Sequence, residues 1–134
     1  MSEKISNERV YTHDEVLVKL AKILPHWFYE DGWIRRKYKT SGWKATMMVV
    51  NTIGHLAEAA WHHPDLTVSY AFVIVKLCTH SAKGITDKDF ELALQIEHVI
   101  QWQPVKAAKA KGEVSALEGT PNEDPRFKYI KYDD

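Results

Sequence analysis

Residues 67–79 read TVSYAFVIVKLCT, an apolar stretch with the two-residue periodicity that is typical of β-structure. The alternation changes phase, so that two sets of residues keep opposite registers: Val68, Tyr70 and Phe72, then Val73, Val75 and Leu77. A single straight strand of this length would span about 43 Å at ~3.3 Å per residue, more than the diameter of about 36 Å of a globule of this chain length. The stretch therefore predicts a strand boundary or a bulge near residue 72.

Three amphipathic helices are predicted around this stretch. Thr12 with Glu15, and Thr86 with Asp89, have the spacing of capping boxes, and each pair precedes apolar residues at helical spacing. Between these two pairs, apolar residues at helical spacing form one long stripe and predict a further helix. This helix should stop near residue 62, because Pro64 disfavours helical geometry at the residue before it. The predicted helices cover residues 12–25, 45–61 and 86–103.

A further strand is predicted within residues 32–43, GWIRRKYKTSGW, where charged and apolar residues alternate between two glycines. The elements then follow in the order helix, strand, helix, strands, helix. This order predicts an α+β domain in which helices cover one face of an antiparallel sheet.

The length of 134 residues is that of one ordinary domain with tails. We expect an N-terminal tail over residues 1–9, a domain over 10–103 and an extension over 104–134 that contains a polar linker and the aromatic-basic segment RFKYIKY. Because this linker crosses no predicted core element, the extension is expected to be dispensable for folding.

Charge and hydropathy narrow the classes of function. The 18 basic residues balance the 18 acidic ones, so no cationic excess favours binding to nucleic acid. No stretch approaches the apolar length of a membrane span, and the polar first residues lack the core of a signal peptide, so we expect a cytoplasmic protein without membrane contact. The single cysteine, Cys78, lies in an apolar run and is interpreted as a buried, inert thiol.

Four of the seven histidines lie close together in the sequence: His55, His62, His63 and His80. The spacing of His55, Glu58 and His62 places them on one helical face, whereas Pro64 directs His63 elsewhere. Imidazole is suited to both giving and taking a proton near neutral pH. Two alternatives stay open: surface histidines with ordinary hydrogen bonds, and a metal site, although neither HExxH nor paired Cys/His spacing is present.

The same residues carry a resemblance to a known family. Glu58, His62-His63-Pro64, Tyr70, His80 and Asp89, with their spacings, are similar to the signature of the pterin-4a-carbinolamine dehydratases over about residues 10–102. The resemblance implies a four-stranded antiparallel sheet with helices on one face, assembled as a homodimer or homotetramer. It also implies dehydration of 4a-hydroxytetrahydropterin to quinonoid dihydropterin in tetrahydrobiopterin recycling, by acid-base catalysis without a metal or cofactor.

Residue roles follow from the resemblance. It implies that His62 and His80 transfer protons and that His63 chiefly binds and orients the pterin. The predicted substrate-binding set also includes Glu58, Trp61, Pro64 and Asp89, the last of which is as well placed to cap a helix. The sequence departs from the family in having a large ring at Trp61 and a compressed segment at 39–46.

Two other functions are compatible with the same fold. The first is a pterin enzyme of molybdopterin or folate metabolism. The second is a non-catalytic assembly or dimerisation partner, for which the C-terminal extension could provide a protein contact. The intact histidine set favours an enzyme.

Overall fold

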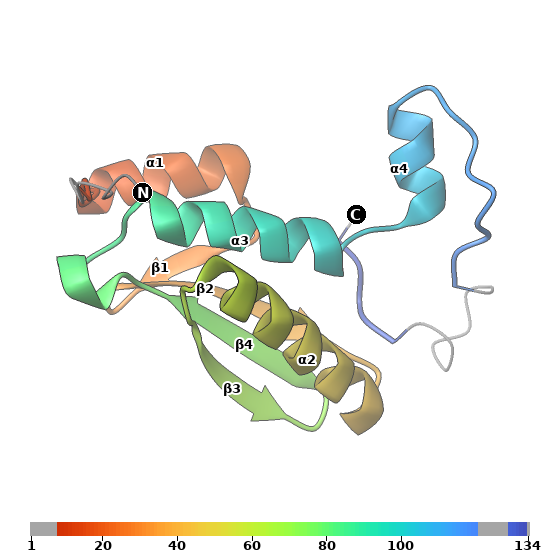
Figure 1. Cartoon of the computed structure of the whole chain (residues 1–134), viewed down its shortest axis with the longest axis horizontal. Helices are drawn as coiled ribbons and strands as arrows, with labels where there is room; N and C mark the ends of the chain where they lie inside the picture. The colour runs from red at the N-terminus through yellow and green to blue at the C-terminus, as the bar shows by residue number, and fades with distance from the viewer. Residues whose placement is uncertain (1–7, 121–128, 134) are drawn as a thin grey trace, which may run out of the picture.

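The computed structural model describes residues 8–120 and 129–133 and contains one four-stranded antiparallel sheet (Figure 1). The strand order is β1-β2-β4-β3. The strands are β1 (Phe28–Glu30), β2 (Trp33–Lys39), β3 (Asp65–Ser69) and β4 (Phe72–Leu77). The predicted α+β class with a four-stranded antiparallel sheet is confirmed.

The phase change in residues 67–79 is a strand boundary. β3 and β4 form a hairpin in which Ser69 pairs with Phe72, so Tyr70 and Ala71 make the turn. Val73, Val75 and Leu77 of β4 are fully buried on the helix-covered face of the sheet. The two registers of the sequence therefore belong to two antiparallel strands.

The strand β1 was not predicted. It pairs with β2 through a two-residue turn in which Asp31 and Gly32 both have positive φ angles, of 51° and 81°. Such a turn suits a hairpin because its twist matches that of the flanking strands, and Asp-Gly is one of its preferred sequences. The strand predicted within 32–43 ends at Lys39, because Trp43 already begins the next helix.

Three helices cover one face of the sheet: α1 (His13–Ile23), α2 (Trp43–Ala60) and α3 (Asp87–Ile100) (Figure 1). Both predicted capping boxes are present, at Thr12 and at Thr86. A 3₁₀ turn, η1 (His80–Ala82), connects β4 to α3. The helix α4 (Pro104–Ala110) was not predicted and projects away from the sheet. Within the described residues, no helix is both long enough and apolar enough to span a membrane.

The C-terminal residues 129–133 return to the sheet. Ile130 pairs with Thr40 and is 2% exposed, and the Lys131 N–H donates to the carbonyl of Lys39 at 2.8 Å. This segment lies along β2, beyond the residues that pair with β1. The extension thus contributes a buried side chain to the core, which the sequence did not predict. The expectation that the extension is dispensable for folding and the domain boundary at residue 104 stay predictions.

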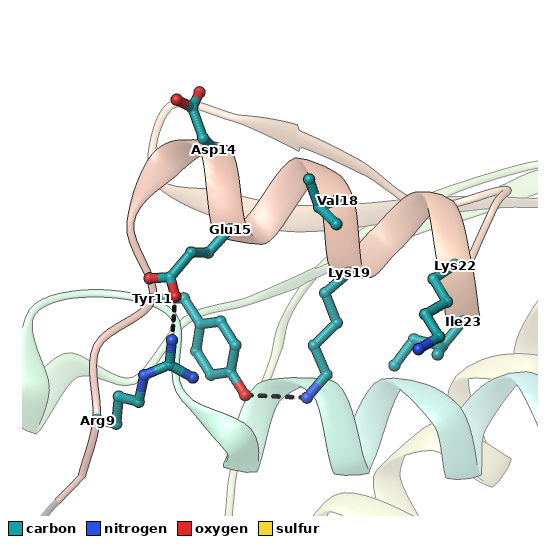
Figure 2. A pocket seen from close by; sticks show the side chains of 8 residues that line it. All are labelled: Arg9, Tyr11, Asp14, Glu15, Val18, Lys19, Lys22 and Ile23. Atoms are coloured by element: carbon teal, nitrogen blue, oxygen red, sulfur yellow. Dashed lines mark hydrogen bonds and ion pairs between the residues drawn. The ribbon is translucent and has the colours of Figure 1, made fainter.

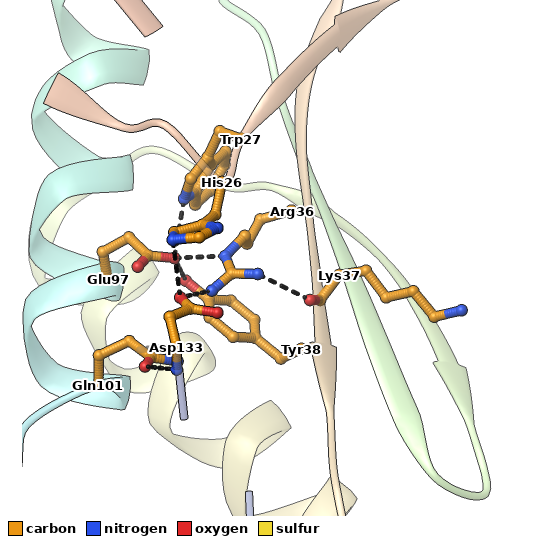
Figure 3. Close-up of polar contacts among 8 residues, drawn as sticks. All are labelled: His26, Trp27, Arg36, Lys37, Tyr38, Glu97, Gln101 and Asp133. Carbon is orange, nitrogen blue, oxygen red and sulfur yellow. Dashed lines mark hydrogen bonds and ion pairs between the residues drawn. The ribbon is translucent and has the colours of Figure 1, made fainter. Parts of the chain in front are cut away.

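A polar cluster holds this segment beside the C-terminal end of α3 (Figure 3). Asp133 forms an ion pair with Arg36, and its N–H donates to Oε1 of Gln101 at 2.9 Å. Arg36 is 7% exposed, and its Nε donates to Oε1 of Glu97 at 2.6 Å. The same Glu97 oxygen accepts hydrogen bonds from two further side chains, Trp27 and Tyr38. The alternation of charged and apolar residues in this segment did not predict that Arg36 is buried. The positive charge of Arg36 is compensated by the carboxylates of Glu97 and Asp133.

Candidate active site

The end of α2 determines where the two adjacent histidines point. Trp61 follows the helix with left-handed φ and ψ angles of 51° and 46°, and the N–H of His62 donates to the carbonyl of Ala57 at 3.2 Å. This is the arrangement of a Schellman motif, in which a left-handed residue turns the chain away from the helix axis. His62 is therefore outside α2, and the prediction that it shares a helical face with His55 and Glu58 is wrong.

His62 is held by Asp89 of α3. Nε2 of His62 lies 2.7 Å from Oδ1 of Asp89, and the two side chains are 14% and 0% exposed. An ionised carboxylate can only accept hydrogen bonds, so Nε2 carries the hydrogen of this contact. The other ring nitrogen, Nδ1, has no hydrogen-bond partner among the described residues.

Asp89 is fixed by two further groups. Its Oδ2 accepts hydrogen bonds from the Thr79 hydroxyl at 2.7 Å and from the Thr86 N–H at 2.9 Å. The hydroxyls of Thr79 and Thr86 are 2.7 Å apart. Full burial and these bonds leave Asp89 no exposed surface for a ligand, so its contact with a substrate could only be indirect. Thr79 is a site residue that sequence reasoning missed, because nothing in its local sequence indicates a partner ten residues away.

His63 belongs to a second group of side chains on the surface. Its Nε2 lies 2.7 Å from Oε1 of Glu58, and its ring is 5.0 Å from that of Trp61 in an edge-to-face arrangement. His63 and Glu58 are 48% and 68% exposed. His63 thus points away from Asp89, as the proline at position 64 predicted, and Pro64 itself directly precedes β3.

His80 lies in η1, in a third group. Its ring is 5.5 Å from that of Trp33 at the start of β2, and its Nδ1 is 3.8 Å from Sγ of Cys78. Burial raises the pKa of the Cys78 thiol, and the charges of Asp89 and Asp65 raise it further. Cys78 is half-buried, and its thiol is kept protonated. Trp33 was not singled out from the sequence, because its partner is 47 residues away.

The structure thus places the predicted residues in three neighbouring groups rather than in one network. Among the described residues, His62, His63 and His80 make no hydrogen bonds to one another. Within residues 8–120 and 129–133, no three metal-ligating side chains gather at one point. His55 is exposed on α2 and joins none of the groups.

A groove in the described part of the chain lies away from these three groups (Figure 2). It has a volume of about 560 Å³ and runs beside α1. Tyr11 lines it, and Nζ of Lys19 donates a hydrogen bond of 2.9 Å to the Tyr11 hydroxyl. None of the predicted site residues lines it. The candidate site therefore lies outside this groove, around the end of α2 and the start of α3.

Comparison with known proteins agrees with the sequence signature. The family model described as pterin 4 alpha carbinolamine dehydratase matches residues 9–99. The chain belongs to this family. A protein of Aquifex aeolicus that bears a provisional pterin-4-alpha-carbinolamine dehydratase name is 44% identical over 93 residues, which are 69% of this chain and 93% of that protein. A relative from Chloroflexus aurantiacus with the same name is 38% identical over 86 residues, 64% of this chain and 91% of that protein.

A solved structure shares the dehydratase-family fold. It is a protein of Brucella melitensis described as a transcriptional coactivator/pterin dehydratase, with a TM-score of 0.62 and 26% identity over 68% of this chain and 98% of that one. The family match ends at residue 99. The returning segment 129–133 therefore lies outside the part of the chain that the family model covers.

Proposed function

We propose that this chain dehydrates a 4a-hydroxytetrahydropterin to a quinonoid dihydropterin, as a step of tetrahydrobiopterin recycling. Membership of the dehydratase family supports the reaction class. The observation that carries the proposal is the pair of His62 and Asp89, in which a fully buried carboxylate orients an imidazole that keeps one nitrogen free. This is the arrangement by which a positioned carboxylate prepares a histidine for proton transfer.

The chemistry needs only proton transfer. The bond between C4a and the hydroxyl oxygen breaks, the oxygen keeps the bonding electrons and gains a proton, and water leaves. A second proton leaves the pterin ring, so a C=N double bond replaces the lost C–O bond. Electrons and protons balance without an oxidant, reductant or metal. The reaction needs only one protein group that gives a proton to the leaving oxygen and one that takes a proton from the pterin ring.

His62 and His80 are the proposed proton-transfer pair. Because Nε2 of His62 faces Asp89, its Nδ1 is the nitrogen that would exchange a proton with the substrate. Asp89 would stabilise the imidazolium that forms when this nitrogen accepts a proton. In His80, Nδ1 faces Cys78, which leaves Nε2 for the substrate. We assign Asp89 as a positioning residue for His62 rather than as a substrate contact.

His63 is the proposed binding and orienting residue. It is more exposed than His62, and Glu58 and Trp61 restrict its ring. We propose that Glu58 and Trp61 act through His63 or by direct contact with the pterin. Pro64 is proposed to direct His63 away from His62. The exposed ring of Trp61, 76% accessible, is available as one wall for a planar substrate.

The assembly is also a proposal. We infer a homodimer or homotetramer from the family resemblance, and size-exclusion chromatography with light scattering measures it. A protein partner for the extension would have to use residues other than the docked ones, since Ile130 and Asp133 contact the chain's own domain.

The test is a dehydratase assay with synthetic 4a-hydroxytetrahydropterin, corrected for the spontaneous loss of water. We expect a rate above the background for the wild type, and a loss of about 10²–10⁴-fold in the enzyme-dependent rate for His62→Ala. His55→Ala is the matched control, because His55 is exposed seven residues earlier and contacts none of the site groups. A folded wild type with no rate above background would contradict the proposal and favour another pterin or a non-catalytic assembly role.

A further inference from the structure

The N-terminal residues 8–11 lie against the segment that carries His80 and Asp89. The Tyr11 N–H donates to the carbonyl of Ile85 at 2.8 Å. A side chain of Val10 packs so closely on Gly84 that a Cβ at residue 84 would come within 2.6 Å of it. The Tyr11 ring packs edge-on against Phe90 of α3, with 4.9 Å between the ring centroids. These contacts fix the N-terminal segment on the connection between η1 and α3.

Glu8, at the start of this segment, bridges the two elements. Its Oε2 accepts a hydrogen bond of 3.3 Å from the Ser81 hydroxyl, and its Oε1 forms an ion pair with Lys88. Its side chain is only 17% exposed. Ser81 directly follows His80 in η1, and Lys88 directly precedes Asp89 in α3. One carboxylate therefore connects the neighbours of two residues that the proposed mechanism uses.

This bridge matters because His62 and His80 make no hydrogen bond to each other. Asp89 of α3 fixes the His62 ring, whereas His80 belongs to η1. The distance between the two rings therefore depends on how η1 sits relative to the first turn of α3. Thr79 links the two regions on the buried side, where its hydroxyl donates to Asp89. Glu8 joins η1 to α3 directly through its side-chain contacts with Ser81 and Lys88.

We propose that Glu8 is a positioning residue of the site, whose carboxylate sets the spacing between His62 and His80 by holding η1 against α3. The inference rests on the proposed function. The hydrogen bond from Lys88 lowers the pKa of the Glu8 carboxyl, which favours its charged form in this bridge. A misplacement of about 1 Å between reacting groups can cost about 10²-fold in rate. A lost bridge should therefore reduce turnover more than binding.

The test compares Glu8→Gln with Glu15→Gln in the full chain. Glu15 is the matched control, because this second carboxylate near the N-terminus pairs with Arg9 and contacts neither η1 nor α3. We expect Glu8→Gln to lower kcat by about 10–10²-fold with KM changed less than about twofold, and Glu15→Gln to leave both unchanged. Circular dichroism and urea unfolding check that both variants fold as the wild type does.

Charge reversal separates the bridge from a general structural effect. The double variant Glu8→Lys with Lys88→Glu restores an ion pair of opposite polarity, so it should recover much of the kcat that Glu8→Lys alone loses. Wild-type kcat in Glu8→Gln would overturn the inference. So would an increase in KM alone, because Glu8 would then be a substrate contact.

A spectroscopic readout keeps this inference separate from the proposed function. In ¹H–¹⁵N spectra of the imidazole rings, Glu8→Gln should shift the resonances of His80 and His62, and Glu15→Gln should not. If the wild type shows no dehydratase activity but these shifts appear, the positioning contact stands and the proposed reaction fails. If the wild type is active and neither kcat nor the resonances respond to Glu8→Gln, the positioning role fails alone.

Discussion

Nε2 of His62 lies 2.7 Å from Oδ1 of Asp89, although the two residues are 27 positions apart in the sequence. One comes just after α2, and the other belongs to the first turn of α3. The same carboxylate also completes the capping box of α3 through the Thr86 N–H. The buried Asp89 carboxylate thus caps the N-terminus of α3 and also orients His62. The stability of the fold and the geometry of the site are therefore coupled.

Asp89→Asn tests this coupling. The amide keeps the size of the side chain but cannot accept the same set of hydrogen bonds, so we expect kcat to fall by up to about 10²-fold, part of the contribution of a positioned acid or base. The free energy of unfolding should fall by about 1–3 kcal/mol, because a buried donor loses its partner. Steady-state kinetics and urea unfolding measure the two effects. An unchanged kcat in a destabilised protein would limit Asp89 to capping.

His80→Ala and His63→Ala should differ in kind. Loss of a proton-transfer group at His80 should lower kcat by about 10²–10⁴-fold. Loss of His63 should chiefly raise KM, as expected when a contact of equal strength in the ground and transition states is removed. Both side chains are exposed or at element ends, so circular dichroism should not change. The reverse pattern, with KM raised by His80→Ala and kcat lowered by His63→Ala, would exchange their roles.

Ile130→Ala tests the return of the C-terminal segment. Removing a buried isoleucine side chain costs about 2–5 kcal/mol of unfolding free energy in typical cores, and Ile130 is 2% exposed. Urea unfolding should detect this loss. Val114→Ala is the control, since Val114 is 97% exposed and its truncation removes no buried contact. Equal stability of the two variants would show that the segment leaves the sheet in solution.

Trp61→Gly tests the turn after α2. A left-handed conformation costs a residue with a Cβ about 1–2 kcal/mol, and glycine avoids this cost. Because the ring is 76% exposed, little burial is lost. We expect Trp61→Gly to be more stable than Trp61→Ala by about 0.5–1 kcal/mol, and both to raise KM through the freed ring of His63. A glycine variant less stable than the alanine variant would contradict the strain at this position.

Local patterns predicted most of the elements. The capping boxes at Thr12 and Thr86 were visible because each joins groups three residues apart, and the β3–β4 boundary followed from the change of register near residue 72. The short strand β1 was missed, because three residues carry little periodicity. The strongest local signal for it is the Asp31-Gly32 turn, a preferred hairpin sequence.

The sequence by itself determined the family, the order of most elements and the different directions of His62 and His63, since these depend on spacing and on the local restriction that Pro64 imposes. Only the tertiary structure decided that Asp89 orients His62, that Trp33 contacts His80 and that Ile130 returns to the sheet. Such contacts join residues 27 to 90 positions apart. They form because packing of the helices on the sheet brings distant segments together, and no local periodicity records which side chains then meet.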